Sequence, residues 1–240
     1  MSLTWLPASV DSKFPPIDHA FEDGLLAAGG DLSASRLIDA YQQGIFPWFN
    51  RNDPILWWSP DPRMVLFTDQ IKVSRSLKKT LRTTAIKVTM DRAFADVISS
   101  CAAPRPNQGD NTDDITWIHP DMIDAYTQLH QQGIAHSVEC WHEGQLIGGL
   151  YGIAIGQVFF GESMFSIMAN SSKIALVALC QQLQRWGFPL IDCQIYSEHL
   201  ASMGAREIVR KDFIGYLDNY CPSVMSDGLW QCDLDLPVIP

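Results

Sequence analysis

The sequence has no long hydrophobic run and no recognisable targeting segment. Nowhere in its 240 residues does an apolar stretch approach the roughly 18 residues that a membrane-spanning helix needs. The first residues, MSLTWLPASVDSKF, contain no basic region followed by an apolar one, so no secretory signal is expected. Hydrophobic residues make up 47% of the chain, which is typical of a soluble globular protein. We therefore expect a cytoplasmic protein that does not bind a membrane.

Cysteine pairs and nucleotide-binding motifs are also missing. The six cysteines are scattered and no two stand at CxxC spacing, which argues against a disulfide framework and favours a reduced compartment. Cys140, His142 and Glu143 lack the second, spaced half of a zinc site. Neither a Walker A loop nor a GxGxxG motif occurs, so no common glycine-rich phosphate loop is expected. The sequence thus predicts no metal and no cofactor.

Positive charge is scarce overall but concentrated in one segment. The chain has 17 basic and 27 acidic residues, a net charge of −10, which argues against general affinity for nucleic acid. Residues 63–92, however, hold eight basic and two acidic residues, a net charge of +6. Such a run is typical either of a solvated helix face or of a site for phosphate groups. The candidates for phosphate contacts are Arg63, Lys72, Arg75, Lys78, Lys79, Arg82 and Lys87.

One stretch is unusually rich in aromatic residues and proline. Residues 45–63, IFPWFNRNDPILWWSPDPR, contain five aromatic residues and four prolines. Proline removes an amide donor and fixes φ, so neither a helix nor a regular strand tolerates this density. One explanation is a stiff turn packed on a core. The other is a platform on which flat ligands such as nucleobases stack. Both explanations stay open on this stretch alone.

The remaining pattern predicts an α+β fold. Three antiparallel strands are expected between residues 136 and 165, with turns at HEGQ and IGQ, because apolar residues alternate and the turns carry glycine. A helix is expected over 171–186 and a short strand over 189–195. An earlier, shorter helix ends at Gly44. This order of elements predicts an α/β layered arrangement around one mixed, largely antiparallel sheet.

The stretch LIDCQI places two polar side chains in an otherwise apolar strand. Because side chains alternate along a strand, Asp192 and Gln194 project from one face. Ile191, Cys193 and Ile195 are then expected to project into the core. The polar pair either satisfies nearby backbone groups or is a carboxylate and an amide that position a nucleophile.

Two further features are ambiguous by themselves. Glu162 follows an apolar run in GESMF, where a buried carboxylate needs a cationic partner. Either the ammonium group of a small ligand or an arginine elsewhere in the fold would serve. Leu176, Leu179, Cys180 and Leu183 share one face of an expected helix. That face is plain core unless neighbouring strands leave a cavity.

Taken together, several long motifs resemble those of one family. GLLAAGGDLSASRLIDAYQQGIFPWF, WWSPDPRMVL, GGLYGIAIGQVFFGESMFS, SSKIAL and LIDCQIYSEHLASMGA resemble bacterial leucyl/phenylalanyl-tRNA–protein transferases, from about residue 14 to 216. The resemblance implies an aminoacyltransferase that moves Leu or Phe, with Met as a further candidate, from aminoacyl-tRNA to the N-terminal Arg or Lys of a protein. The product would be marked for degradation by the N-degron pathway. The resemblance also implies a small N-terminal domain, residues 1–62, and a GNAT-like acyltransferase domain, residues 63–240, without metal or ATP.

The same resemblance implies roles for individual residues. Asp192 and Gln194 match the catalytic residues of the family, and we expect them to orient the attacking amine while Asp192 draws off or delocalises its proton. Trp48 and Trp117 match tryptophans that contact the terminal adenosine of tRNA. The implied amino-acid pocket has Glu162 at its base and is formed by Leu150, Phe159, Met164, Leu176, Leu179, Leu183 and Ile191.

The implied partners are Leu-tRNA, Phe-tRNA and acceptor proteins, and the absence of a heptad pattern favours a monomer. Two other functions stay open. An acetyl-CoA-dependent N-acetyltransferase would share the implied fold, but the junction SIMANSSKIAL lacks the glycine-rich pyrophosphate loop of such enzymes. A non-catalytic module that binds tRNA or protein N-termini would need no transfer step.

Overall fold

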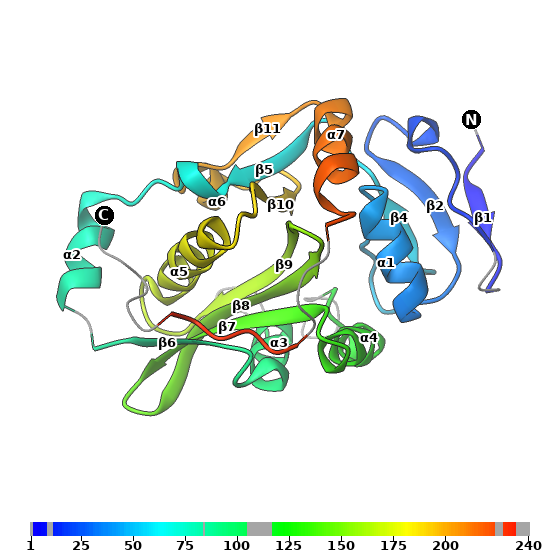
Figure 1. Cartoon of the computed structure of the whole chain (residues 1–240). Helices are drawn as coiled ribbons and strands as arrows, with labels where there is room; N and C mark the ends of the chain where they lie inside the picture. Colours follow the sequence, from blue (N-terminus) through cyan, green and yellow to red (C-terminus); the bar gives the residue numbers. More distant parts are fainter. Residues whose placement is uncertain (1, 9–11, 84, 105–116, 224–227, 234–240) are drawn as a thin grey trace.

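The computed structural model describes residues 2–8, 12–83, 85–104, 117–223 and 228–233 (Figure 1). Its strands form a four-stranded and a seven-stranded sheet. The helices are α1 (Ala34–Gln42), α2 (Arg75–Thr83), α3 (Phe94–Ala102), α4 (Pro120–Gln131), α5 (Ser171–Arg185), α6 (Glu198–Ser202) and α7 (Arg210–Tyr220), with 3-10 turns η1 (Ile17–His19) and η2 (Thr68–Gln70). In these ranges no helix combines the length and the hydropathy needed to span a membrane.

The small sheet has the strand order β1-β2-β4-β3 and contains part of the proline-rich stretch. Its strands are β1 (Thr4–Leu6), β2 (Leu25–Gly29), β3 (Phe46–Pro47) and β4 (Leu56–Trp58). After α1 the chain turns at Gly44, whose φ of 73° is left-handed, as expected for the residue that ends a helix. Trp57 is fully buried whereas Trp48 is 39% exposed. The aromatic stretch therefore contributes both to a core and to an accessible surface.

The large sheet has the strand order β11-β5-β10-β9-β8-β7-β6. Its strands are β5 (Arg63–Phe67), β6 (Lys87–Met90), β7 (Ala135–His142), β8 (Gln145–Ile155), β9 (Val158–Ser166), β10 (Leu190–Gln194) and β11 (Arg206–Ile208). Neighbouring strands are antiparallel except β9 and β10, which are parallel. The predicted meander corresponds to β7, β8 and β9. The expected α+β class, with a mixed and largely antiparallel sheet, is confirmed.

Helices cover both faces of the large sheet (Figure 1). α5 packs on one face, with α2 beside it, and α3 and α4 pack on the other. Strand β5 shows the alternation directly. Met64 and Leu66 belong to the core that contains α5, whereas Val65 and Phe67 belong to the core that contains α3 and α4. Because successive side chains point to opposite faces of the sheet, β5 contributes residues to both cores.

The expected domain boundary falls in the link 59–62 between β4 and β5. Leu37 of α1 and Phe94 of α3 nevertheless share one hydrophobic core, so the two sheets are joined by packing. The division into domains 1–62 and 63–240 stays a prediction.

The separation of β9 and β10 positions the site. Residues 190–192 of β10 pair with residues 158–160 of β9. Beyond this point β9 continues along β8 as far as Ser166, whereas the register of β10 shifts between Asp192 and Gln194. Gln194 has a φ of 64°, a left-handed backbone conformation that residues other than glycine adopt only at special positions. The two strands therefore lead away from each other beyond Asp192.

The prediction that Ile195 points into the core is wrong, because this side chain is 43% exposed. The prediction assumed strict alternation, and the bulge with its left-handed Gln194 interrupts that alternation.

Candidate active site

A cavity of about 970 Å³ lies where β9 and β10 separate. Its lining comes from β3 and the loop after it, the end of α3, β8, β9, the first half of α5 and the segment from β10 into α6. These segments are far apart in sequence, so only the fold brings them together. The volume is within the range of roughly 300–1,000 Å³ that is usual for small-molecule sites.

The apolar wall of the cavity contains all but one of the residues expected there. Those that line it are Leu150, Phe159, Met164, Leu176, Leu179 and Ile191. Leu183 does not line it but is fully buried in the core beneath α5. The expectation for Leu183 is therefore wrong. The apolar face of α5 continues one turn beyond the cavity, and helical spacing does not show where the cavity ends. Contact of the six wall residues with a substrate stays a prediction.

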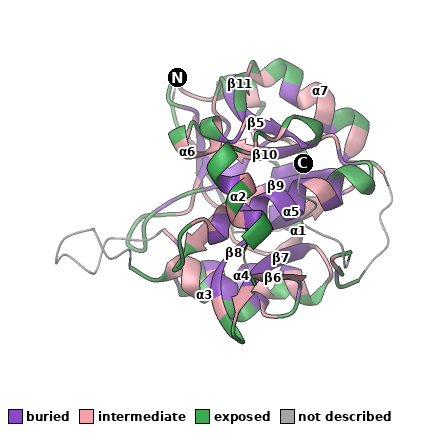
Figure 2. Cartoon of the chain, turned by 90° about the vertical axis from the view of Figure 1, so that its left-hand side faces the viewer, coloured by how far each residue is buried: buried purple, intermediate pink, exposed green. Residues whose placement is uncertain are grey.

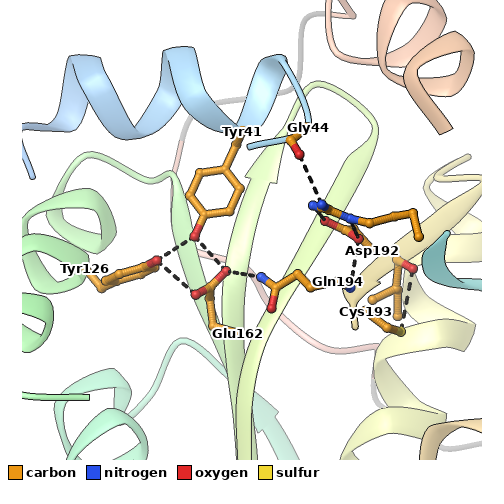
Figure 3. Close-up of polar contacts among 9 residues, drawn as sticks. Tyr41, Gly44, Tyr126, Glu162, Asp192, Cys193 and Gln194 are labelled. Atoms are coloured by element: carbon orange, nitrogen blue, oxygen red, sulfur yellow. Dashed lines mark hydrogen bonds and ion pairs between the residues drawn. The ribbon is translucent and has the colours of Figure 1, made fainter. Parts of the chain in front are cut away.

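Glu162 lines the cavity and belongs to a hydrogen-bond network (Figure 3). Tyr41 of α1 donates its hydroxyl to Glu162 Oε1 at 2.7 Å, and Tyr126 of α4 donates to Oε2 at 2.9 Å. The two tyrosine oxygens are 2.5 Å apart. Gln194 donates its side-chain Nε2 to Oε1 at 2.8 Å. Among the residues described, hydroxyl and amide donors thus satisfy this carboxyl group, and no arginine pairs with it.

Burial raises the pKa of Glu162 to about 7, and the charge of Asp192 adds to the rise. The three hydrogen bonds favour the ionised form and so act against burial. Burial, followed by the charge of Glu162, raises the pKa of Tyr41 and of Tyr126 well above the ordinary tyrosine value. Both hydroxyls therefore keep their protons near neutral pH. A carboxyl group that changes charge near pH 7 is suited to proton transfer.

Asp192 and Arg63 form a fully buried ion pair. Arg63 donates Nε to Asp192 Oδ1 at 2.8 Å and Nη2 to Oδ2 at 2.7 Å, and both side chains are 0% exposed. Arg63 also donates Nη1 to the carbonyl of Gly44 at 3.0 Å. Its guanidinium lies 4.8 Å from the ring centres of both Phe46 and Phe213. The prediction that Arg63 contacts tRNA phosphate is wrong, because the group is enclosed and its donors are directed inward.

Asp192 connects this ion pair to Gln194. Its Oδ1 also accepts the backbone amide of Gln194 at 2.9 Å, which holds the bulge in place. From the bulge the amide side chain of Gln194 points to Glu162 (Figure 3). Arg63, Asp192, Gln194 and Glu162 thus form one continuous hydrogen-bonded chain. The sequence predicted Asp192, Gln194 and Glu162 as site residues, but not the contact of Arg63 with Asp192 or that of Gln194 with Glu162.

Trp48 and Trp117 both line the cavity and are contributed by separate loops. The ring centres of Trp48 and Trp58 are 5.7 Å apart, with the rings tilted by 57°. Trp58 donates its indole Nε1 to the carbonyl of Trp48 at 2.6 Å. This contact fixes the backbone that carries Trp48, and its partly exposed ring is available for stacking. Binding of adenosine there stays a prediction.

The other candidate phosphate contacts lie outside the cavity. Their side chains are exposed for Lys72, Arg75, Lys79, Arg82 and Lys87, and half-buried for Lys78. Figure 2 shows α2 with exposed positions along its outer side, in front of the buried α5. Asn170, just before α5, donates Nδ2 to Thr80 Oγ1 of α2 at 3.4 Å. The basic residues of α2, which are Arg75, Lys78, Lys79 and Arg82, form the basic face of this helix. This face is next to the start of α5, and its contact with phosphate stays a prediction.

Tyr41 and Tyr126 were not expected in the site. They are 121 and 36 positions from Glu162 in the sequence. Each stands on a helix and is fully buried, and a tyrosine in that setting is typical of core. No local signal marks them, because their role depends on a contact with a distant strand.

Similarity to solved structures is low. L-PGS from Bacillus licheniformis is 9% identical with a TM-score of 0.35, over 73% of this chain and 57% of that chain. A GCN5-related N-acetyltransferase from Kribbella flavida is 10% identical with a TM-score of 0.32, over 70% of this chain and 58% of that chain. The chain thus spans little more than half of either protein, and TM-scores this low support no further statement.

Similarity to one family of sequences is high. The family model described as leucyl/phenylalanyl-tRNA protein transferase matches residues 65–218, and the model for the N-terminal domain of that family matches residues 30–61. The proteins of that name from three bacteria are close relatives. The one from Nitrosomonas eutropha is 56% identical over 95% of this chain and 96% of its own length. The one from Nitrosospira multiformis is 59% identical over 88% of this chain and 89% of its own length. The one from Pseudomonas fluorescens Pf-5 is 56% identical over 95% of this chain and 99% of its own length.

The residues matched by the two family models include every residue that lines the cavity. The chain belongs to the leucyl/phenylalanyl-tRNA–protein transferase family.

Proposed function

We propose that this protein transfers Leu or Phe from aminoacyl-tRNA to the N-terminal Arg or Lys of acceptor proteins. The observation that carries the proposal is the cavity, which combines an apolar wall, two tryptophans and a hydrogen-bonded carboxyl and amide group. Membership of the family supports the same reaction.

The apolar wall suits an uncharged donor side chain. Leu176 and Leu179 of α5 and Phe159 of β9 offer no hydrogen-bond partner, so a charged or strongly polar side chain would lose its hydration there without compensation. One methylene group is worth only about 1–3 kcal/mol in such a pocket, so shape must supply the rest of the discrimination. Leu, Phe and Met share an unbranched β-carbon, and this common shape makes Met a further donor.

The two tryptophans suit the terminal adenosine of the donor. Stacking of a base on an aromatic ring is worth about 1–3 kcal/mol. Trp48 is 39% exposed at the edge of the cavity and its backbone is fixed by Trp58, so its ring is accessible and in a defined position. Trp117 lines the same cavity.

The reaction is the aminolysis of an ester. The ester bond of aminoacyl-tRNA is already activated, and an α-amino group with a pKa of about 7.7–8.0 is partly neutral at pH 7. Orientation is then the main task, worth on the order of 7–11 kcal/mol at best. Gln194 orients the amine with its amide. Asp192 is the positioning residue, because both of its oxygens accept from Arg63 and one also holds the backbone of Gln194.

The basic face of α2 suits the acceptor stem of tRNA. Contacts of lysine and arginine with phosphate do not depend on base sequence, and an enzyme that accepts several tRNAs needs such contacts. The reaction takes place in the cytoplasm, where aminoacyl-tRNA is found, and the new N-terminal residue marks the acceptor for degradation.

A transfer assay tests the proposal. Purified protein is incubated with labelled Leu-, Phe- or Met-tRNA and with peptides that begin with Arg, Lys or Ala. We expect labelled product with Arg and Lys and none with Ala. We also expect Gln194→Ala to lose most of the activity and Gln231→Ala, at an exposed position, to keep it. Binding of tRNA without transfer, or acetyl transfer from acetyl-CoA, would overturn the proposal.

A further inference from the structure

The contacts around Glu162 call for more protons than two tyrosines supply. Three oxygen–oxygen contacts form a closed triangle, of 2.5 Å between Tyr41 and Tyr126, 2.7 Å between Tyr41 and Glu162, and 2.9 Å between Tyr126 and Glu162. Each hydrogen bond between oxygens needs one proton, and each tyrosine hydroxyl carries one. The triangle therefore needs a third proton.

The charge of Glu162 decides whether that proton is present. When Glu162 is ionised, both hydroxyls donate to its carboxylate, and the two tyrosine oxygens then face each other at 2.5 Å with no proton between them. When Glu162 is protonated, three protons fill three contacts and the ring is closed. The free protein therefore already has the arrangement that accommodates a third proton.

The surroundings keep the two forms close in free energy. The titratable and charged groups that face this site are Tyr41 of α1, Tyr126 of α4, Cys101 of α3, Tyr151 of β8, Asp192 of β10 and, bound to Asp192, Arg63 of β5. Burial and the charge of Asp192 favour the protonated form, whereas the hydrogen bonds donated by Tyr41, Tyr126 and Gln194 favour the ionised form. Arg63 is fully engaged by Asp192 and Gly44, so it does not pair with Glu162.

Asp192 is poorly placed to handle a proton. Both of its oxygens accept from Arg63 and its side chain is 0% exposed, so a proton on either oxygen would break a buried ion pair. Within the described lining of the cavity, Glu162 is the other carboxyl group.

We propose that Glu162, rather than Asp192, accepts the proton of the attacking amine, and that the ring with Tyr41 and Tyr126 holds this proton until the ester breaks. This inference rests on the proposed function. The amine nitrogen forms a bond to the ester carbonyl carbon while one N–H proton passes to ionised Glu162. The ring then holds its third proton. When the bond between the carbonyl carbon and the ribose oxygen breaks, the proton passes to that oxygen and Glu162 is ionised again.

Infrared spectroscopy tests the protonation state without any transfer. Ordinary carboxyl groups are ionised above about pH 6. We expect the wild type to keep a protonated carboxyl band above about pH 6. The band should titrate with a midpoint of about 7 and be absent from Glu162→Gln. The wild-type band is informative even if the variant does not fold. A wild type with no such band above about pH 6, or with a Glu162 midpoint near the ordinary value of 4.5, overturns the inference.

Single-turnover transfer tests the catalytic role. We expect Glu162→Gln to lower the rate by roughly 10²–10⁴-fold while a non-hydrolysable leucyl-adenosine analogue still binds. Tyr41→Phe and Tyr126→Phe each remove one ring oxygen and should slow transfer less. Glu207→Gln, at an exposed position on β11, should leave the rate unchanged. A Glu162→Gln variant that transfers at the wild-type rate overturns the inference and leaves the proposed function standing. If the wild-type protein transfers nothing, the proposed function is wrong instead. The infrared titration then still measures the protonation of Glu162.

Discussion

Arg63 and Asp192 face each other through two hydrogen bonds of 2.8 and 2.7 Å, both side chains fully buried. The pair joins the neighbouring strands β5 and β10, and Asp192 extends the constraint to the backbone of Gln194. A buried charge that loses its partner is costly, because no water replaces the partner. The ion pair therefore fixes the bulge and, with it, the position of the amide in the cavity.

Removing one half of this pair should destabilise the protein strongly. We expect Arg63→Ala to lower the free energy of unfolding by about 3–5 kcal/mol, since it leaves Asp192 buried without a partner. Arg206 is a matched control, because it is exposed and its guanidinium lies over the Phe67 ring at 4.7 Å. We expect Arg206→Ala to cost no more than about 1 kcal/mol. Urea denaturation of both variants measures the difference, and equal losses would count against a structural role for the pair.

The stability of the protein should depend on pH through Glu162. Its pKa of about 7 in the folded protein lies above its ordinary value of 4.5, so the folded state binds the proton more tightly. The resulting stabilisation is fully present below about pH 4.5 and is lost as the pH rises to about 7, an effect on the order of 3 kcal/mol. Glu162→Gln lacks this contribution. Unfolding free energies across this range should therefore fall in the wild type relative to the variant. A difference that stays constant with pH would contradict the raised pKa.

Loss of the Trp48 ring should weaken binding of the donor's adenosine. We expect Trp48→Ala to reduce the affinity for a leucyl-adenosine analogue by about 1–3 kcal/mol. Trp5, on β1 and 66% exposed, is not part of the cavity lining and serves as the control. Calorimetric titration of the two variants makes the comparison. Unchanged affinity in Trp48→Ala would remove the stacking role.

Basic residues of α2 that contact tRNA phosphates should contribute to the salt dependence of tRNA binding. Removing one lysine or arginine that binds a phosphate should reduce the slope of log K against log salt by about 0.7–0.9. We expect this change in Lys79→Ala and Arg82→Ala, but not in Lys211→Ala on α7, and all three side chains are exposed. Binding of the leucyl-adenosine analogue, which has no acceptor stem, should be the same in all three. A slope that does not differ between α2 and α7 variants would exclude α2 from the interface.

Local patterns predicted most of the fold. The alternation of residues 136–165 and the helical spacing of 171–186 depend on neighbouring residues alone, and both segments formed the expected elements. Alternation failed at Ile195, where the register shift beside Asp192 and the left-handed Gln194 are set by contacts with Arg63 and Glu162 from other strands.

The site was predicted less completely, for a related reason. Arg63 stands at the start of a basic segment, and its charge suggested exposure, yet it begins a strand whose residues are all buried. Its partner Asp192 is 129 positions away. Tyr41 and Tyr126 likewise gain their role only through Glu162. Sequence spacing reports what is near along the chain, and these groups meet only in the folded protein.

A crystal structure with a non-hydrolysable leucyl-adenosine amide tests the central assignment most directly. The leucine side chain should lie between β9 and β10 against Leu176 and Ile191, with adenine on Trp48 and the amide bond within hydrogen-bond reach of Gln194. A leucine side chain directed out of the cavity, or an analogue bound elsewhere on the protein, would contradict the assignment.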